Sequence, residues 1–203
     1  MENTFHKILA AHTLNDEQIT VQVISDNHPD MVLATKLWYE VYIQELEYPF
    51  YKGVCLKAET LDCNRDGSLV FMLLCNGKCI ATLRATHSDF TSLEFKYRDY
   101  SDKERLFEIT RLVTRKDYRQ GRYTKLIIYH AETYLKHHFE YEGIVMNAIE
   151  KLVGYYQRIG FKKISNDAIQ HPILGKKICL MYSSFKDFEN VVNKMGNTLS
   201  IHA

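Results

Sequence analysis

The sequence predicts a single α/β or α+β domain built on a mixed β-sheet. Several segments alternate apolar and polar residues at period two, and segments with apolar residues at helical spacing lie between them. The dipeptide Asn76-Gly77 is a strong hairpin signal, so part of the sheet is antiparallel. Strands joined by hairpins, together with strands joined by helices, produce a mixed sheet flanked by helices. We expect one domain over residues 1–203, with a lead-in at 1–17 and a tail at 185–203.

Each element is predicted from its local pattern. Ile19, Val21 and Val23 alternate with polar residues, which is typical of a half-buried strand. Pro29 suits the first turn of a helix, and an apolar stripe follows it at helical spacing. The expected order is a loose or helical lead-in at 1–17, a strand at 19–23, a helix from 29 to about 48, a loop at 51–67, strands at 69–74 and 79–86, irregular chain at 88–104, a strand at 107–114, a helix at 124–139, a strand at 143–148, a helix at 151–159, strands at 161–164 and 177–182, and a last helix at 186–194.

Composition and charge exclude several classes of protein. Apolar residues make up 46% and charged residues 25% of the chain, which is typical of a globular protein. The formal net charge of +1 gives no general attraction to nucleic acid. No apolar run approaches the roughly 20 residues that a membrane span needs, and the N-terminus lacks a signal-peptide pattern. The five cysteines are an odd number, so we expect free thiols in a reducing cytoplasm.

The chemistry concentrates in residues 107–161, beginning with the turn at 119–124. This turn joins a predicted strand to a predicted helix, and a helix start attracts phosphate through its unpaired N–H groups. Gly121 would let the backbone approach a ligand closely. The basic residues around the turn suit a pyrophosphate or an acidic carrier protein, although a solvated basic turn is the alternative interpretation. They are Arg111, Arg115, Lys116, Arg119, Arg122 and Lys125.

Two separated motifs resemble those of the Gcn5-related N-acetyltransferase (GNAT) superfamily. The first is a strand that ends in Leu-Val-Thr, followed by Asp-Tyr-Arg-Gln-Gly-Arg and a helix; the second is Asn147 with the later run 156–161, Tyr-Gln-Arg-Ile-Gly-Phe. The resemblance covers roughly residues 69–183 and implies a mostly antiparallel sheet, splayed at a bulge in its central strand. It implies an acyl-pantetheine donor as co-substrate and no permanently bound cofactor. The implied donor-binding residues are Leu112, Val113, Thr114, Arg119, Gln120, Gly121, Arg122, Tyr123, Thr124 and Asn147.

One departure from the superfamily pattern points to a branch within it. The turn lacks the usual second small residue after Gly121, and we expect the bulky Tyr123 to narrow the phosphate cradle. Glu108-x-x-Arg111-Leu and the run 38–48 resemble the branch of N-acyl amino acid synthases and acyl-homoserine lactone synthases. Arg84 is a weaker match to that branch. Members of the branch take long acyl chains, typically from acyl carrier protein, and an acidic carrier would dock on the basic turn.

Three residues are candidates for catalysis. Amide formation from a thioester requires a neutral amine, a stabilised oxyanion and a protonated leaving thiolate. Glu108 is the candidate base, directly or through water; the alternative is an exposed or ion-paired strand carboxylate. Arg111 either holds Glu108 across a bulge or binds a substrate carboxylate, or it is a surface cation; without a bulge the two lie on opposite faces. Tyr156 matches the superfamily position that protonates the thiolate, with aromatic packing as the alternative.

The substrate-binding candidates are Trp38, Tyr42 and Arg84. An acyl-chain tunnel lined by Trp38 and Tyr42 with Phe50, Tyr51 and Phe71 is one interpretation, and an ordinary core is the other. We expect no metal site, because Cys75 and Cys79 flank a tight hairpin and no matching ligand pair follows them.

These observations predict an N-acyltransferase of the N-acyl amino acid synthase kind. It would move a long acyl group from acyl carrier protein, or from acyl-CoA, to the amine of an amino acid or a similar small molecule. The alternatives are an acetyl-CoA-dependent N-acetyltransferase of small amines, an acyl-homoserine lactone synthase, and a catalytically silent ligand-binding module. The acyl length, the amine and the oligomeric state stay open at this point.

Overall fold

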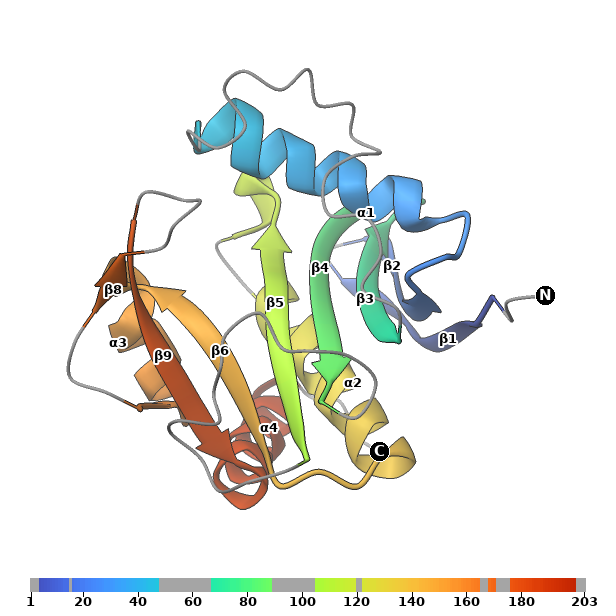
Figure 1. The fold of residues 1–203 in the computed structure, drawn as a ribbon. Coiled ribbons are helices and arrows are strands. Elements are labelled where there is room, and N and C mark those ends of the chain that lie inside the picture. The colour runs from blue at the N-terminus through green and yellow to red at the C-terminus, as the bar shows by residue number, and fades with distance from the viewer. Residues whose placement is uncertain are drawn as a thin grey trace.

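A computed structural model describes residues 4–14, 16–47, 67–88, 105–119, 122–164, 168–170 and 176–199. In this part of the chain one sheet has the order β1-β2-β3-β4-β5-β6-β9-β7, and β8 pairs with β9 (Figure 1). Neighbouring strands are antiparallel except β5 and β6, which are parallel, so the prediction of a mixed, mostly antiparallel sheet is confirmed. The strands are β1 His6–Leu14, β2 Glu17–Ser25, β3 Ser68–Cys75, β4 Lys78–His87, β5 Leu106–Thr114, β6 Gly143–Ile149, β7 Lys162–Lys163, β8 Ile169–Gln170 and β9 Lys177–Ser184.

Helices cover both faces of the sheet (Figure 1). One apolar core lies between the sheet and the helices α2, α3 and α4, and a second core lies between the sheet and α1. The face of the sheet that packs on α2 is called the α2 face below, and the opposite one the α1 face. None of the described helices is long and apolar enough to cross a membrane. The helices are α1 Met31–Trp38 with a π-helical continuation Tyr39–Glu45, α2 Tyr123–His138, α3 Val153–Arg158 and α4 Phe185–Leu199, with 3-10 turns at Lys116–Tyr118 and Glu150–Leu152.

The lead-in predicted at 1–17 is wrong, because most of it forms the edge strand β1. A bulge between Ile8 and Ala10 interrupts the alternation of apolar and polar side chains by which a strand is predicted. The apolar Ile8 is 59% exposed, so it does not follow the buried side of that alternation. The hairpin to β2 turns at Asp16, which has a φ of 63°. β8 was also not predicted; its two residues pair with β9. The C-terminal tail is mostly helix α4, which packs against α2.

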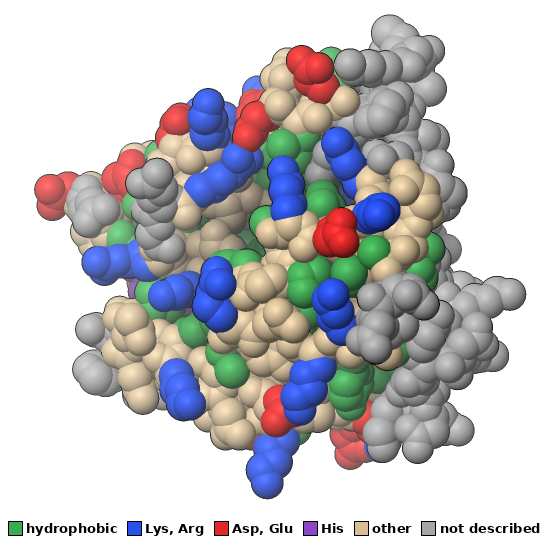
Figure 2. All heavy atoms as spheres, turned by 90° about the vertical axis from the view of Figure 1, so that its left-hand side faces the viewer, with side chains coloured by type: hydrophobic (Ala, Val, Ile, Leu, Met, Phe, Trp, Pro, Cys, Tyr) green, Lys and Arg blue, Asp and Glu red, His purple; other side chains and the backbone are tan. Residues whose placement is uncertain are grey.

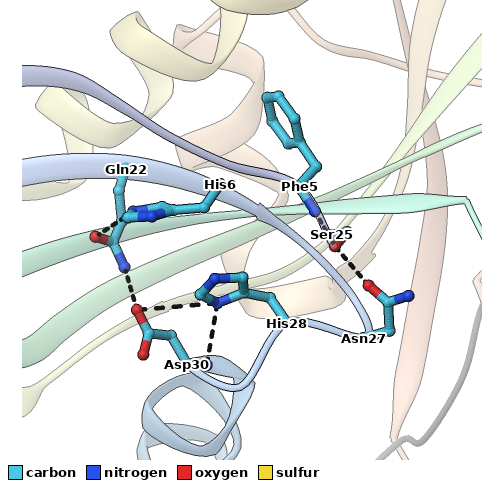
Figure 3. Close-up of polar contacts among 7 residues, drawn as sticks. All are labelled: Phe5, His6, Gln22, Ser25, Asn27, His28 and Asp30. Carbon is cyan, nitrogen blue, oxygen red and sulfur yellow. Dashed lines mark hydrogen bonds and ion pairs between the residues drawn. The ribbon is translucent and has the colours of Figure 1, made fainter. Parts of the chain in front are cut away.

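A chain of polar contacts fastens the start of β1 to β2 and to the start of α1 (Figure 3). The Phe5 amide donates to Ser25 Oγ at 3.0 Å, and the ring of His6 contacts Gln22 Oε1 at 3.2 Å. Gln22 is buried, and its amide nitrogen donates to Asp30 Oδ2 at 3.5 Å, just before α1. These long-range partners explain why an irregular segment becomes part of the sheet.

A β-bulge lies in the middle of β5. Arg111 has a φ of 52°, and the register between β4 and β5 shifts so that Leu83 faces two residues, Arg111 and Leu112. Thr82 holds this bulge from β4: its Oγ1 donates to the Arg111 carbonyl at 2.9 Å and accepts from Trp38 Nε1 at 2.8 Å. The bulge expected from the superfamily resemblance is therefore present.

Beyond the bulge, β5 separates from β6. The parallel pairing runs from Leu106 opposite Gly143 to Ile109 opposite Met146 and ends there. β5 continues to Thr114 paired only with β4, while β6 continues to Ile149 paired with β9. The predicted splay at the central strand is confirmed.

Replacing Thr82 by Val tests whether this hydroxyl holds the bulge. Val keeps the shape but leaves the Trp38 N–H and the Arg111 carbonyl without their partner, so we expect the free energy of unfolding to fall by about 2 kcal/mol. Urea denaturation measures it. Thr13→Val on exposed β1 is the control, with a change within about 0.5 kcal/mol. Equal stabilities of the Thr82 variant and the wild type would contradict this role.

The contact between β1 and α2 predicts a pH dependence. His12 Nε2 lies 2.9 Å from His130 Nε2, and burial, with His12 nearby, lowers the pKa of His130 to about 4. Between pH 6.5 and 4 the unfolded chain therefore binds a proton that the folded one does not, so stability is lost as the pH falls through this window, by about 3 kcal/mol. The His130→Gln variant should show a shallower loss in denaturation at each pH. Thr133→Val, which removes no titrating group, should keep the wild-type slope.

Candidate functional site

The bulge gathers the predicted catalytic residues of β5 on one face of the sheet. Glu108 and Thr110 alternate onto the α1 face, where Arg84 Nε donates to Thr110 Oγ1 at 2.9 Å. The extra residue of the bulge shifts the alternation of side chains along β5. Arg111 therefore lies on the α1 face with Glu108 and Thr110 instead of pointing to the α2 face. The Arg111 guanidinium lies 5.7 Å from the ring centroid of Trp38. The condition under which Arg111 and Glu108 share a face is therefore met.

Two of the charged groups on this face are buried. Glu108 is 0% exposed and Arg84 is 3% exposed. Arg84 stands opposite Thr110 in the register, so it is a diagonal neighbour of Glu108, within the reach of a long side chain. Charges persist in such places only with compensating groups close by. The α1 face thus contains a buried polar centre with groups of both charges.

Aromatic residues wall this centre on the side of α1. Trp38 is fully buried, and Tyr42 is half-buried with its ring centroid 5.5 Å from the Arg111 guanidinium. The predicted tunnel does not form as a group: Phe71 packs on the α2 face, edge-on to Tyr134 at 5.7 Å. Phe50 and Tyr51 lie outside the described residues.

The separation of β5 from β6 places the predicted donor-binding residues along an open strand edge. Leu112, Val113 and Thr114 lie beyond the last β5–β6 pair, and Asn147 is the first residue of β6 past it. Thr114 and Thr124 are joined by a hydroxyl hydrogen bond of 2.9 Å, which ties the end of β5 to the start of α2. The strand edge, Asn147 and the helix start therefore border one opening.

Two cations of the turn are engaged in ion pairs. Arg119 forms a bidentate pair with Glu45 at 2.5 and 2.7 Å, and its Nε donates to the Thr114 carbonyl at 2.8 Å. Arg115 pairs with Glu40 at 2.5 Å. The hydrogen bond from Arg119 lowers the pKa of Glu45. Both acids belong to the π-helical segment, which is thereby held against the turn. Lys116, Arg122 and Lys125 are exposed, whereas Gln120 and Gly121 lie outside the described residues.

Tyr123 does not narrow the turn as expected. Its side chain is 7% exposed, packs in the core on the α2 face and donates from its hydroxyl to Glu17 of β2 at 3.0 Å. The first residue of an amphipathic helix lies on its apolar face here, so the ring points to the sheet and away from the solvent side of the turn. The expected obstruction is wrong.

Tyr156 of α3 lies on the α2 face, where an apolar pocket with a cavity volume of about 20 Å³ adjoins the opening. Leu112, the residue that follows the bulge, lines the same pocket. No local sequence pattern predicts this pocket, because its lining residues come from separate strands and helices. The lining residues are Leu83, Ile109, Leu112, Ile128, Ala131, Glu132, Leu135, Ile144, Met146, Tyr156, Ile159, Phe161 and Phe188.

Glu132 is the residue of this wall that sequence reasoning missed. It is 4% exposed, and burial raises the pKa of its carboxyl to about 7. A signal was present in the sequence, since Glu132 falls at helical spacing between Ile128 and Leu135 on the apolar face of α2.

Comparisons with known proteins agree with this geometry. The family model described as N-acyl amino acid synthase FeeM matches residues 34–184, most of the chain. No curated protein matches the sequence. The crystal structure of FeeM, an N-acyl amino acid synthase from uncultured soil microbes, is 11% identical and covers 93% of each chain with a TM-score of 0.60.

Two further solved structures share the fold at low identity. The acyl-homoserine lactone synthase BjaI, described as CoA-dependent, is 7% identical, with 86% of this chain and 88% of that chain covered and a TM-score of 0.64. Escherichia coli ElaA is 16% identical, with 81% and 99% covered and a TM-score of 0.60. The splayed sheet, the bulge and the match over residues 34–184 together lead to one assignment. The chain belongs to the FeeM family of N-acyl amino acid synthases and is an N-acyltransferase of the GNAT type.

Proposed function

We propose that the protein transfers a long acyl group from acyl carrier protein, or from acyl-CoA, to the α-amine of an amino acid or a similar small molecule. The observation that carries this proposal is the opening of β5 away from β6 directly above the buried Glu108. A thioester bound in this opening would lie close to a carboxylate that is enclosed in the sheet.

The donor would lie along the open edge of β5. Main-chain groups of residues 112–114 on this edge are outside the β5–β6 ladder and suit the amides of a pantetheine arm. The acyl chain would enter the apolar pocket, whose wall includes Leu112 and Tyr156. Each methylene buried against this apolar wall would stabilise binding by about 0.8 kcal/mol, so the chemistry of the wall favours a long chain over an acetyl group.

Charge supports a carrier protein as the donor, with acyl-CoA as the second candidate. Figure 2 shows Lys and Arg side chains spread over the side of the molecule on which α3 and β8 lie. An acidic carrier would dock on such a surface by charge complementarity. BjaI, by its description, depends on CoA, so both donors suit this fold. The exposed basic residues of this side and of the turn include Lys116, Arg122, Lys125, Lys151, Arg158, Lys163 and Lys177.

The acceptor would bind on the α1 face. Arg111 presents a planar donor fork that suits a carboxylate, and the rings of Trp38 and Tyr42 lie beside it. Arg84 is a second cation of this face. An amino acid bound by its carboxylate there would direct its amine toward Glu108 and the opening.

The reaction then needs no covalent enzyme intermediate. The amine nitrogen attacks the thioester carbonyl carbon, a C–N bond forms and the C–S bond breaks. Glu108 takes the proton that the nitrogen loses, directly or through water, and Tyr156 supplies a proton to the leaving sulfur. Glu108 faces the α1 side and Tyr156 the α2 side, so acceptor and donor would meet from opposite faces of the sheet.

Removal of the two proton-transfer groups should abolish turnover without abolishing donor binding. For Glu108→Gln and Tyr156→Phe we expect kcat to fall by roughly 10²–10⁴-fold, because each loses one proton transfer. Mass spectrometry of N-acyl products from acyl carrier protein or acyl-CoA donors with single amino acids measures it, and calorimetry measures donor binding. Tyr155→Phe is the matched control and should remain active. Absence of an N-acyl product from every donor and acceptor would overturn the proposal.

We expect Arg111 to bind the carboxylate of the acceptor. We expect the wild type to prefer an amino acid over the corresponding decarboxylated amine by about tenfold or more in kcat/KM. Arg111→Gln should remove this preference by raising KM for the amino acid while leaving KM for the donor unchanged. Lys116→Gln, an exposed cation of the turn, is the control and should keep the preference. An Arg111 variant with wild-type selectivity would exclude this role.

A further inference from the structure

The apolar pocket on the α2 face contains one acidic side chain. Glu132 of α2 is 4% exposed and lines the pocket together with residues that are otherwise apolar or aromatic. Its Oε1 atom is buried and has no hydrogen-bond partner among the described residues. Buried polar atoms in folded proteins nearly always have a partner, so this carboxyl oxygen is available to a polar ligand atom that enters the pocket.

The neighbouring charges do not satisfy this carboxyl. Lys136, one turn further along α2, pairs with Glu189 of α4. The pKa of Glu132 is raised to about 7, first by burial and then by the charge of Glu189, against the opposing influence of Lys136 and His137. Near neutral pH the group is therefore protonated to a large extent. It can then both donate and accept a hydrogen bond.

Glu132 lies deep in the pocket relative to the thioester. Thr124, bonded to Thr114, marks the end of α2 near the opening, and Glu132 follows eight residues later, about 12 Å along the helix axis. α2 runs back toward the beginning of β5, since Phe139 after its last turn contacts Phe107 at 5.4 Å between ring centroids. An acyl chain that enters beside Leu112 would meet Glu132 well beyond its carbonyl carbon.

A second polar group without a partner lies in the same part of the core. The hydroxyl of Tyr141 is buried and has no hydrogen-bond partner within the described residues. The Tyr141 ring packs edge-on against Phe107 at 5.2 Å, and the pKa of Tyr141 is raised by burial and by the charge of Glu132. Two unsatisfied groups near one place favour a polar ligand atom over a chance arrangement.

We propose that Glu132 determines the acyl specificity of the enzyme by binding a hydroxyl group carried on the acyl chain at a carbon remote from the thioester. This inference rests on the proposed function, since it assumes that the pocket holds the acyl chain. A hydroxyl can donate to one oxygen of the carboxyl and accept from the other when the group is protonated. An unsubstituted chain would leave Glu132 buried and unsatisfied and would bind less tightly.

The test compares straight-chain acyl thioesters of acyl carrier protein and of CoA, of increasing length, each unsubstituted or carrying one hydroxyl at successive carbons. With the wild type we expect the best hydroxylated donor to exceed its unsubstituted counterpart by about tenfold or more in kcat/KM. Glu132→Leu should reverse this ratio by accepting the plain chain, whereas Glu132→Gln, which still donates and accepts, should retain most of it. Glu140→Gln changes an exposed carboxylate outside the pocket wall and should leave the ratio unchanged.

The outcomes separate the inference from the proposed function. Turnover of unsubstituted donors with no gain from any hydroxyl, or a ratio that Glu132→Leu does not change, would overturn the inference while acyl transfer stands. If no donor is turned over, acyl transfer itself fails. Calorimetric binding of the free hydroxylated and unsubstituted fatty acids to wild type and Glu132→Leu then decides the inference. Equal affinities in both proteins would overturn it.

Discussion

The hydrogen bond from Thr82 to the Arg111 carbonyl is the contact on which the candidate site depends. It fixes one extra residue in β5 opposite Leu83, and this residue changes the side-chain phase of everything that follows. Glu108 and Arg111 thereby share a face, while Leu112 turns to the other. The bulge also lies close to the point at which β5 separates from β6. The last parallel pair involves Ile109, two residues before Arg111.

Within the described residues, the sheet divides two chemically different environments. On the α1 face a buried carboxylate and two arginines form a polar centre beside aromatic rings. On the α2 face the pocket is almost wholly apolar. Such a division suits a reaction between a charged small molecule and a lipid-like chain. The polar α1 face would stabilise the charged molecule, and the apolar α2 face would stabilise the chain.

At the edge of the site, acidic residues of the π-helical segment form ion pairs with basic residues of the turn. Glu45 holds Arg119 in a bidentate pair, and Glu40 holds Arg115. Arg119 also donates to the Thr114 carbonyl, so its side chain links the π-helical segment to the end of β5. An anionic donor would first contact the exposed cations and would then compete with Glu45 for Arg119. Salt would weaken this attraction between the donor and the cations.

Elements with local signals, and the motifs whose spacing follows from them, could be predicted from the order of residues. The Asn76-Gly77 hairpin, the period-two strand of β2 and the stripe of α1 depend on neighbours in the chain, and so does the order of β5, turn and α2. Three features depend on long-range packing: residues near the N-terminus pair as β1, Tyr123 turns into the core, and Glu132 lines a pocket. These outcomes depend on partners far away in sequence, which no local period encodes.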